Sequence, residues 1–123
     1  MLIEIDFNSE DAIYLQLRNQ IVLMIARREL QNGEALPSVR QLAAEIGVNM
    51  HTVNKAYSML RQEGYVQLDR RHGAVVSVEC DKKLHVENVY SDMELFVAEA
   101  ICKDISLREL QSLIEDVYSK INQ

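Results

Sequence analysis

The sequence predicts a mainly α-helical protein with one small β-hairpin, and three observations lead to this fold class. Apolar residues recur at helical spacing through most of the chain. Only two short runs, Tyr65 to Asp69 and Ala74 to Val78, have a β-prone composition. The segment Leu36 to Asn49 has the pattern of a short helix, a glycine turn and the cap of a second helix. Together these features predict a winged helix-turn-helix domain followed by two further helices.

The first predicted helix is long and amphipathic. Met1 to Phe7 alternates apolar and polar residues, which is typical of a short extended segment, and Ser9 can cap the helix that follows. The apolar positions of this helix are Ile13, Leu17, Ile21, Met24, Ile25 and Leu30. Because Asn32 and Gly33 suit the left-handed backbone after a helix, we expect the helix to end there.

The next two helices make up the predicted helix-turn-helix. Ser38 is a good N-cap, and Gln41 three residues later completes a capping-box pattern. The apolar face of this short helix is Leu42, Ala43 and Ile46. Gly47 permits the sharp turn that follows, and Asn49 can cap the next helix. That helix buries Val53, Ala56, Tyr57 and Leu60 and leaves Met50, His51, Asn54 and Lys55 free.

The hairpin and the tail complete the chain. The turn from Arg70 to Gly73 separates the two β-prone runs, in the position of a wing, and Asp81 to Lys83 is a polar joint. The first tail helix carries the apolar stripe Val86, Val89, Tyr90, Met93, Val97 and Ala100. The second begins with the capping box Ser106 to Glu109 and carries Leu110, Leu113, Ile114, Val117 and Ile121. We therefore expect a domain of residues 1–78 and a tail of residues 79–123.

Two amphipathic helices cannot close a core of useful size by themselves. We expect the two tail stripes to be buried against a partner subunit, so that the tail forms a homodimer. The alternative is that the stripes fold back on the first helix of their own chain.

The charge is distributed unevenly along the chain. The net charge is −6 over 123 residues, but residues 1–78 hold eight basic and nine acidic side chains, whereas residues 79–123 hold five and ten. Between Leu36 and Val76, five basic residues outnumber three acidic ones. Because charges act within about a Debye length, roughly 8 to 10 Å, an acidic tail does not prevent the helix-turn-helix from attracting an anionic partner.

Several classes of protein are not indicated. No apolar run approaches the roughly 20 residues that span a bilayer and no signal peptide is apparent, so we expect a cytoplasmic protein without membrane contact. Cys80 and Cys102 lie far apart without a CxxC spacing, so we expect reduced, structural thiols. The three histidines have no metal-ligand or catalytic spacing and there is no glycine-rich phosphate loop, so we expect no enzyme activity, cofactor or metal.

Two segments carry a resemblance to a known family. Leu36-Pro37-Ser38-Val39-Arg40-Gln41-Leu42-Ala43 and Thr52-Val53-Asn54-Lys55-Ala56-Tyr57, followed by the wing, resemble the GntR transcriptional regulators from about Asp6 to Val78. The short tail is similar to that of the YtrA-type branch. The resemblance implies a homodimeric repressor that binds an inverted-repeat operator in double-stranded DNA, often beside ABC transporter genes. It leaves open whether a small-molecule effector binds: the short tail argues against an enclosed pocket, but not against a site between subunits.

The resemblance also implies the residues that contact DNA. Ser38 and Arg40 would contact the backbone or the groove edge from the second helix, and the wing tip at Arg71, His72 and Gly73 would enter the minor groove. The recognition-helix positions are Asn49, Met50, His51, Thr52, Asn54 and Lys55. Their residue types agree with this role, since Asn54 can present a donor and an acceptor to adenine and Arg40 can form a two-pronged contact. The alternative function is a winged-helix module that binds protein and not DNA.

Overall fold

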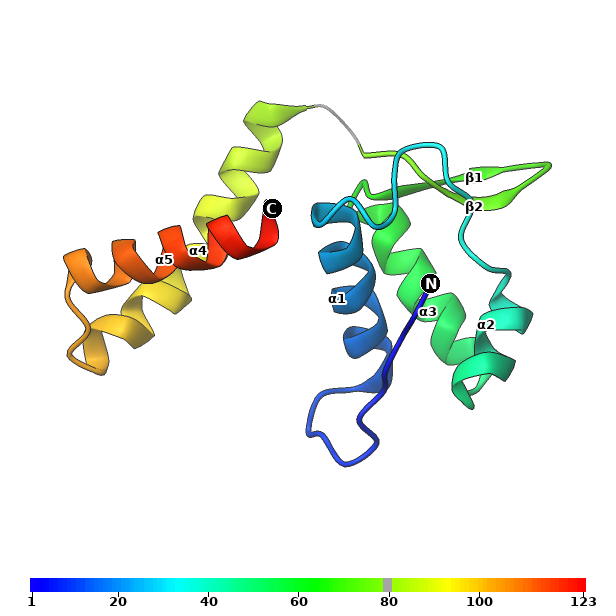
Figure 1. Ribbon diagram of the computed structural model, residues 1–123, viewed down its shortest axis with the longest axis horizontal. Coiled ribbons are helices and arrows are strands. Elements are labelled where there is room, and N and C mark those ends of the chain that lie inside the picture. The colour runs from blue at the N-terminus through cyan, green and yellow to red at the C-terminus, as the bar shows by residue number, and fades with distance from the viewer. Residues whose placement is uncertain (79–80) are drawn as a thin grey trace. The chain divides into compact units, whose positions relative to one another are not determined.

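A computed structural model describes residues 1–78 and 81–123, and the chain divides into two compact units, residues 1–79 and 80–123. The first unit contains α1 (Ile13–Ala26), α2 (Val39–Ile46), α3 (Met50–Gln62), β1 (Val66–Asp69) and β2 (Gly73–Val76), and the second contains α4 (Lys82–Cys102) and α5 (Leu107–Ile121) (Figure 1). This order confirms the predicted fold class of a mainly α protein with one hairpin.

One apolar core holds the first unit together. Helices α1 and α3 lie side by side, and α2 packs against α3 (Figure 1). The largest fully buried side chains are Leu17, Ile21, Leu42, Val53, Leu60, Val66 and Val76. All four predicted buried positions of α3, which are Val53, Ala56, Tyr57 and Leu60, are buried, so that the opposite side of α3 is left exposed. Truncating such a leucine to alanine typically costs about 2–5 kcal/mol of stability.

Both predicted ends of α1 are wrong. The helix begins after Ala12, which gives no side-chain cap, while the Ser9 hydroxyl accepts the N–H of Asp11 in the preceding turn at 3.1 Å. It ends at Ala26, because Arg28 adopts a left-handed backbone with φ of 63°. The chain then reverses, and the N–H of Leu30 bonds to the carbonyl of Met24 at 3.2 Å. Leu30 is buried as its pattern suggested, but by this reversal and not by a longer helix.

Glutamines of α1 hold the N-terminal segment in place. Gln16 accepts the N–H of Asp6 at 2.9 Å and donates to the carbonyl of the same residue at 2.9 Å. Gln20 makes the same pair of bonds with the backbone of Glu4. The side-chain amides therefore supply the hydrogen bonds that a neighbouring strand would otherwise make to this backbone, although the segment belongs to no sheet.

The caps of the helix-turn-helix agree with the predictions. The Ser38 hydroxyl accepts the N–H of Gln41 at 3.1 Å, and the Asn49 side chain accepts the N–H of His51 at 2.7 Å. Gly47 takes the left-handed position between the helices, with φ of 71°. The second half of the capping box is not formed, since the Gln41 side chain donates to Glu45 instead, at 3.3 Å.

The wing is a short antiparallel hairpin. Val66 pairs with Val76 and Asp69 pairs with Gly73, so the strands are shorter than predicted and Gly73 belongs to β2. A third segment, which no sequence pattern predicted, joins this hairpin. Ala35 forms a bridge with Val75, and the N–H of Leu36 bonds to the carbonyl of Ala74 at 2.8 Å. This pairing ties the segment before α2 to the wing.

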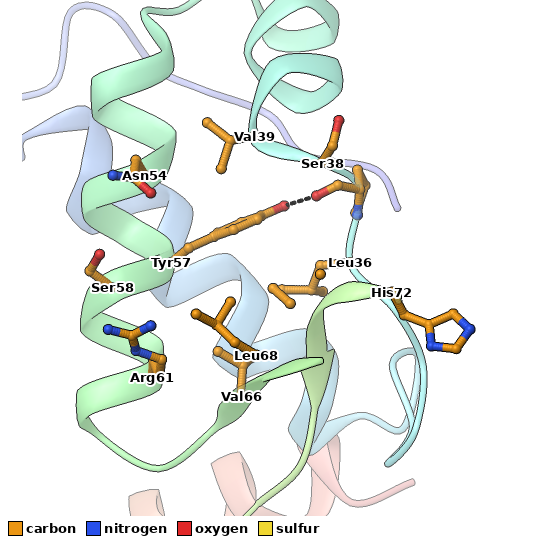
Figure 2. Close-up of a pocket in the computed structure, with 13 residues that line it drawn as sticks. Leu36, Ser38, Val39, Asn54, Tyr57, Ser58, Arg61, Val66, Leu68 and His72 are labelled. Carbon is orange, nitrogen blue, oxygen red and sulfur yellow. Dashed lines mark hydrogen bonds between the residues drawn. The ribbon is translucent and has the colours of Figure 1, made fainter. Parts of the chain in front are cut away.

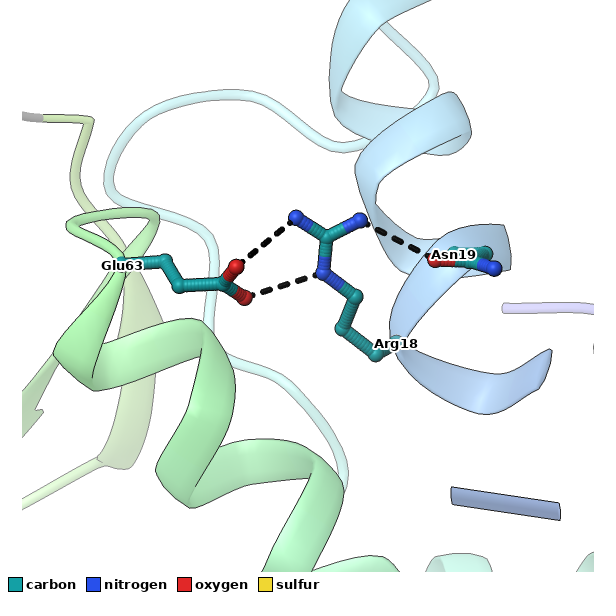
Figure 3. A network of polar contacts seen from close by, with 3 residues as sticks. All are labelled: Arg18, Asn19 and Glu63. Atoms are coloured by element: carbon teal, nitrogen blue, oxygen red, sulfur yellow. Dashed lines mark hydrogen bonds and ion pairs between the residues drawn. The ribbon is translucent and has the colours of Figure 1, made fainter. Parts of the chain in front are cut away.

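An ion pair fastens α1 to the end of α3. The Arg18 guanidinium donates to both carboxylate oxygens of Glu63, at 2.9 and 3.1 Å, and to the side chain of Asn19 (Figure 3). It also lies over the ring of Tyr65, 5.6 Å from the centroid. The hydrogen bond to Glu63 raises the pKa of Arg18, so this link keeps its charge.

The tail unit is a helical hairpin with a small buried apex. Ala100 and Leu110 are buried near the turn, where Asp104 has a left-handed φ of 61°. The expected polar joint is wrong, because Asp81 caps α4 by accepting the N–H of Leu84 at 3.2 Å and both lysines lie in the helix. The Ser106 cap of α5 is confirmed, with the N–H of Glu109 at 3.1 Å.

Most of the apolar side chains of the tail are exposed within this chain. The exposed members of the two predicted stripes are Val86, Val89, Tyr90, Met93, Leu113, Ile114 and Val117. The apolar surface of α4 is wider than the stripe, since Leu95, Phe96 and Ile101 are exposed as well. Monomeric proteins rarely leave so many large apolar side chains in contact with water.

Candidate nucleic-acid interface

The first turns of α3 present an exposed polar face. The Asn49 cap fixes the start of the helix, and Met50, His51 and Asn54 follow on its exposed side. Together with Asn49 and Val39, they line a shallow hollow. None of these side chains is acidic, so an anionic ligand meets no carboxylate here. We call the surface formed by Asn49, Met50, His51 and Asn54 the reading face.

A second hollow, of ≈ 420 Å³, lies between α3 and the wing. Its rim carries polar side chains from three elements: Ser38 before α2, Asn54, Ser58 and Arg61 on α3, and His72 at the wing tip (Figure 2). Its floor is apolar and includes Leu36, Tyr57, Val66 and Leu68. Asn54 lines both hollows, which makes the reading face and this wing hollow one continuous surface.

Tyr57 joins the two helices of the helix-turn-helix at the floor of the wing hollow. Its ring extends from α3 toward the segment before α2, and its O–H donates to the carbonyl of Pro37 at 2.7 Å (Figure 2). Burial raises the pKa of Tyr57, so the hydroxyl remains a donor at neutral pH. This bond fixes the position of the neighbouring Ser38 relative to the reading face.

Ser38 and Arg40 lie at the start of α2, where both side chains are exposed. The Ser38 hydroxyl accepts one backbone N–H in the cap but still has its own hydrogen to donate. Arg40 forms no ion pair with any side chain in the described part of the chain. A guanidinium without a carboxylate partner is available for an external anion.

Two of the predicted contact residues on α3, Thr52 and Lys55, line neither hollow. Thr52 is half-buried. The Lys55 ammonium lies over the ring of Tyr14 on α1, 3.9 Å from its centroid. The structure therefore places Lys55 beside α1 and not on the reading face, although its side chain stays exposed.

The wing tip is ordered by one carboxylate. Asp69 accepts the N–H of Arg71 at 2.7 Å and pairs with Nδ1 of His72 at 3.4 Å. The backbone hydrogen bond from Arg71, together with the His72 side chain, holds the pKa of Asp69 below its usual value. The His72 ring points away from α3 (Figure 2). Gly73 has a left-handed backbone with φ of 72°, which favours glycine. Crowding is not the reason, since no atom lies within 4 Å of the place where a Cβ would be.

The sequence interpretation missed two residues of the wing hollow, Ser58 and Arg61. The signal was present in their spacing, because they follow Asn54 by four and seven residues and so share its side of a helix. Arg61 is exposed. Like Arg40, it makes no ion pair with the described side chains.

Other kinds of site find little support in the described residues. They contain no cluster of three or more histidine, cysteine or acidic side chains that could hold a metal ion. Cys102 is a free thiol and is exposed, so it is not part of a buried core, and Cys80 lies outside the described residues. Across the described ranges, no helix is both long enough and apolar enough to cross a membrane.

The fold and this surface define a class of protein. A helix-turn-helix whose second helix has a free polar face, followed by a hairpin at its side, is the winged helix-turn-helix arrangement of DNA-binding domains. Comparison with known proteins gives the family. The pattern of the bacterial regulatory proteins of the gntR family matches residues 11–76.

Individual relatives cover the tail as well. The HTH-type transcriptional repressor YtrA of Bacillus subtilis is 30% identical, over 98% of this chain and 95% of its own length. The solved structure of YtrA from Sulfolobus acidocaldarius is 37% identical and superimposes with a TM-score of 0.62, over 98% of this chain and all of that one. The HTH-type transcriptional regulator YhcF of B. subtilis is 36% identical, but this match spans 61% of this chain and 62% of YhcF. The chain therefore belongs to the gntR family, in its YtrA-type branch.

Proposed function

We propose that this protein is a homodimeric repressor that binds an inverted-repeat operator through the reading face and the wing. The observation that carries the proposal is the continuous surface formed by the reading face and the wing hollow, which has polar side chains along its rim and no acidic residue in its lining. Helix α3 fits the major groove, which is roughly 12 Å wide, with its first turns toward the base edges. The resemblance to YtrA-type regulators extends the proposal to the control of ABC transporter genes.

Within this proposal the contacts divide by role. Asn54 and His51 read base edges, and Met50 makes an apolar contact, for example with a thymine methyl group. Ser38 and Arg40 hold the phosphate backbone and set the register without reading sequence. Arg71, His72 and Gly73 place the wing in the neighbouring minor groove. Thr52 contributes a backbone contact, and Lys55 adds positive charge at the side of the helix.

The tail supplies the dimer in this proposal. The exposed apolar side chains of α4 and α5 need a partner surface, and a second copy of the same tail offers one of matching character. A twofold dimer presents two reading faces and so requires two half-sites in opposite orientation. This is the physical reason for expecting an inverted repeat.

Binding to a fluorescein-labelled duplex, followed by anisotropy at several salt concentrations, tests DNA binding. We expect salt-dependent binding by the wild type, and we expect Arg40→Ala to weaken binding to every duplex and to reduce the slope of log K against log salt by about 1. Arg27→Ala is the matched control, because it removes the same charge from an exposed site of the same unit that lines neither hollow. Absence of salt-dependent binding by the wild type would contradict the proposal and favour a protein-interaction module.

A further inference from the structure

We propose that one strand of the sugar-phosphate backbone of the DNA binds in the wing hollow and that Arg61 contacts its phosphate. Arg61 is not among the contact residues predicted from the sequence. This inference rests on the proposed function, because it concerns the same duplex. When α3 enters a major groove and the wing tip enters the adjacent minor groove, one backbone strand separates the two grooves. That strand must pass between α3 and the wing. The structure has a hollow of ≈ 420 Å³ in this position.

The charge of the hollow favours a phosphate. Arg61 lines it from α3, and none of its lining residues is acidic. The carboxylate nearest to Arg61 in sequence, Glu63, already receives two hydrogen bonds from Arg18. The Arg61 guanidinium therefore has no competing carboxylate there, and a guanidinium can bind two oxygens of one phosphate.

The position of Arg61 along α3 agrees with a backbone contact and not a base contact. It lies seven residues after Asn54, which is two helical turns, or about 10 Å along the axis. The two side chains therefore share one side of the helix but lie at different depths of the interface. Ser58 lies between them and adds a hydroxyl to the same side.

An exposed leucine, Leu68, lies on the floor of the wing hollow. Side chains two residues apart in a strand share one face, yet Val66 is 2% exposed whereas Leu68 is 65% exposed. The hollow leaves Leu68 uncovered on the side of the hairpin that faces the core (Figure 2). The apolar carbons of a deoxyribose would cover it while the adjacent phosphate meets Arg61.

The test compares the full-length wild type with Arg61→Gln, with Arg27→Gln as the charge-matched control. For the wild type, each phosphate contact contributes about a three- to fourfold loss of affinity between 50 and 200 mM salt. We call the affinity at 50 mM salt divided by the affinity at 200 mM salt the salt ratio. On any duplex, we expect the salt ratio of Arg61→Gln to be about three- to fourfold smaller than that of the wild type, whereas Arg27→Gln keeps the wild-type salt ratio. Leu68→Ala should weaken binding severalfold and leave the salt ratio unchanged, because it removes no charge.

Replacing one DNA phosphate at a time with an uncharged methylphosphonate shows which phosphate Arg61 contacts. In duplexes that carry one methylphosphonate each, the wild type should lose affinity at a phosphate between the major-groove half-site and the adjacent minor groove. Arg61→Gln should be insensitive to that same replacement, because the partner is already absent. One outcome would contradict this inference alone: Arg61→Gln keeps the salt ratio and the methylphosphonate pattern of the wild type, while Arg40→Ala binds less well. The DNA backbone would then not bind at Arg61, but the proposed function would stand. If the wild type binds none of the duplexes, the proposed function itself fails.

Discussion

Asn54 connects the two hollows of the interface, and its side chain is the one best suited to read a base. It lines the hollow at the start of α3 as well as the hollow beside the wing. Its amide can give a donor and an acceptor to an adenine edge, which no aliphatic side chain can replace. The neighbouring contacts from Ser38 and Arg40 would hold the protein on the duplex without this residue.

Replacement of Asn54 by alanine should therefore remove discrimination at one base pair and preserve most of the binding to nonspecific DNA. We expect a loss of about 1–3 kcal/mol of preference at that position. Competition between an operator duplex and its single-base variants measures the change. Gln62→Ala on the same helix is the control, because Gln62 is exposed and lines neither hollow. Unchanged discrimination in Asn54→Ala would show that the reading face has been assigned to the wrong residues.

The direction of individual side chains was the least predictable part of the site. Sequence spacing identified the exposed positions of α3, but it could not show that the Lys55 ammonium lies over Tyr14, a residue 41 positions earlier in the chain. The opposite happened with Arg61, which was not predicted as a contact residue but lines the wing hollow. Its role depends on the wing, which folds back beside α3 and turns an ordinary surface arginine into the rim of a hollow.

At the scale of elements, the helices with strong local signals were predicted well. Ser38, Gly47 and Asn49 act through bonds or backbone angles within a few residues, and each does what the sequence indicates. The end of α1 and the bridge between Ala35 and Val75 depend on contacts between distant segments. Arg28 adopts the left-handed conformation although glycine was available five residues later, and no local rule predicts that choice.

The exposed faces of α4 and α5 lead to a prediction about assembly. Leu113 is 54% exposed, and Leu113→Asp would place a charge in the interface that we propose for the tail. We expect this variant to be monomeric in light scattering and to bind an inverted-repeat duplex about 10²-fold less tightly, because the second half-site no longer adds avidity.

Ser112→Asp is the matched control for this experiment. It adds the same charge at the adjacent exposed position of α5, outside the apolar stripe, and should remain dimeric. A Leu113→Asp protein that stays fully dimeric would place the dimer interface elsewhere.

At the scale of the whole molecule, the acidic charge is concentrated in the tail and not on the surface that we propose for DNA binding. Residues 79–123 carry most of the net charge of −6, whereas the reading face and the wing hollow contain no acidic side chain. Surface charges are screened beyond roughly 8 to 10 Å, so the lack of acidic side chains in the reading face and the wing hollow matters more for binding an anion there than the net charge of the whole chain does. Such a protein should depend on specific contacts for its affinity to a larger extent than a uniformly basic one.

Selection of duplexes from a random-sequence pool by the full-length protein, followed by sequencing, tests the central claim most directly. If the exposed face of α3 reads duplex DNA in a twofold dimer, the retained sequences will share an inverted repeat. The centres of its half-sites should lie about one helical turn, roughly 34–36 Å, or a multiple of it apart. Retained sequences with no enrichment over the starting pool would contradict the claim that this surface recognises DNA sequence.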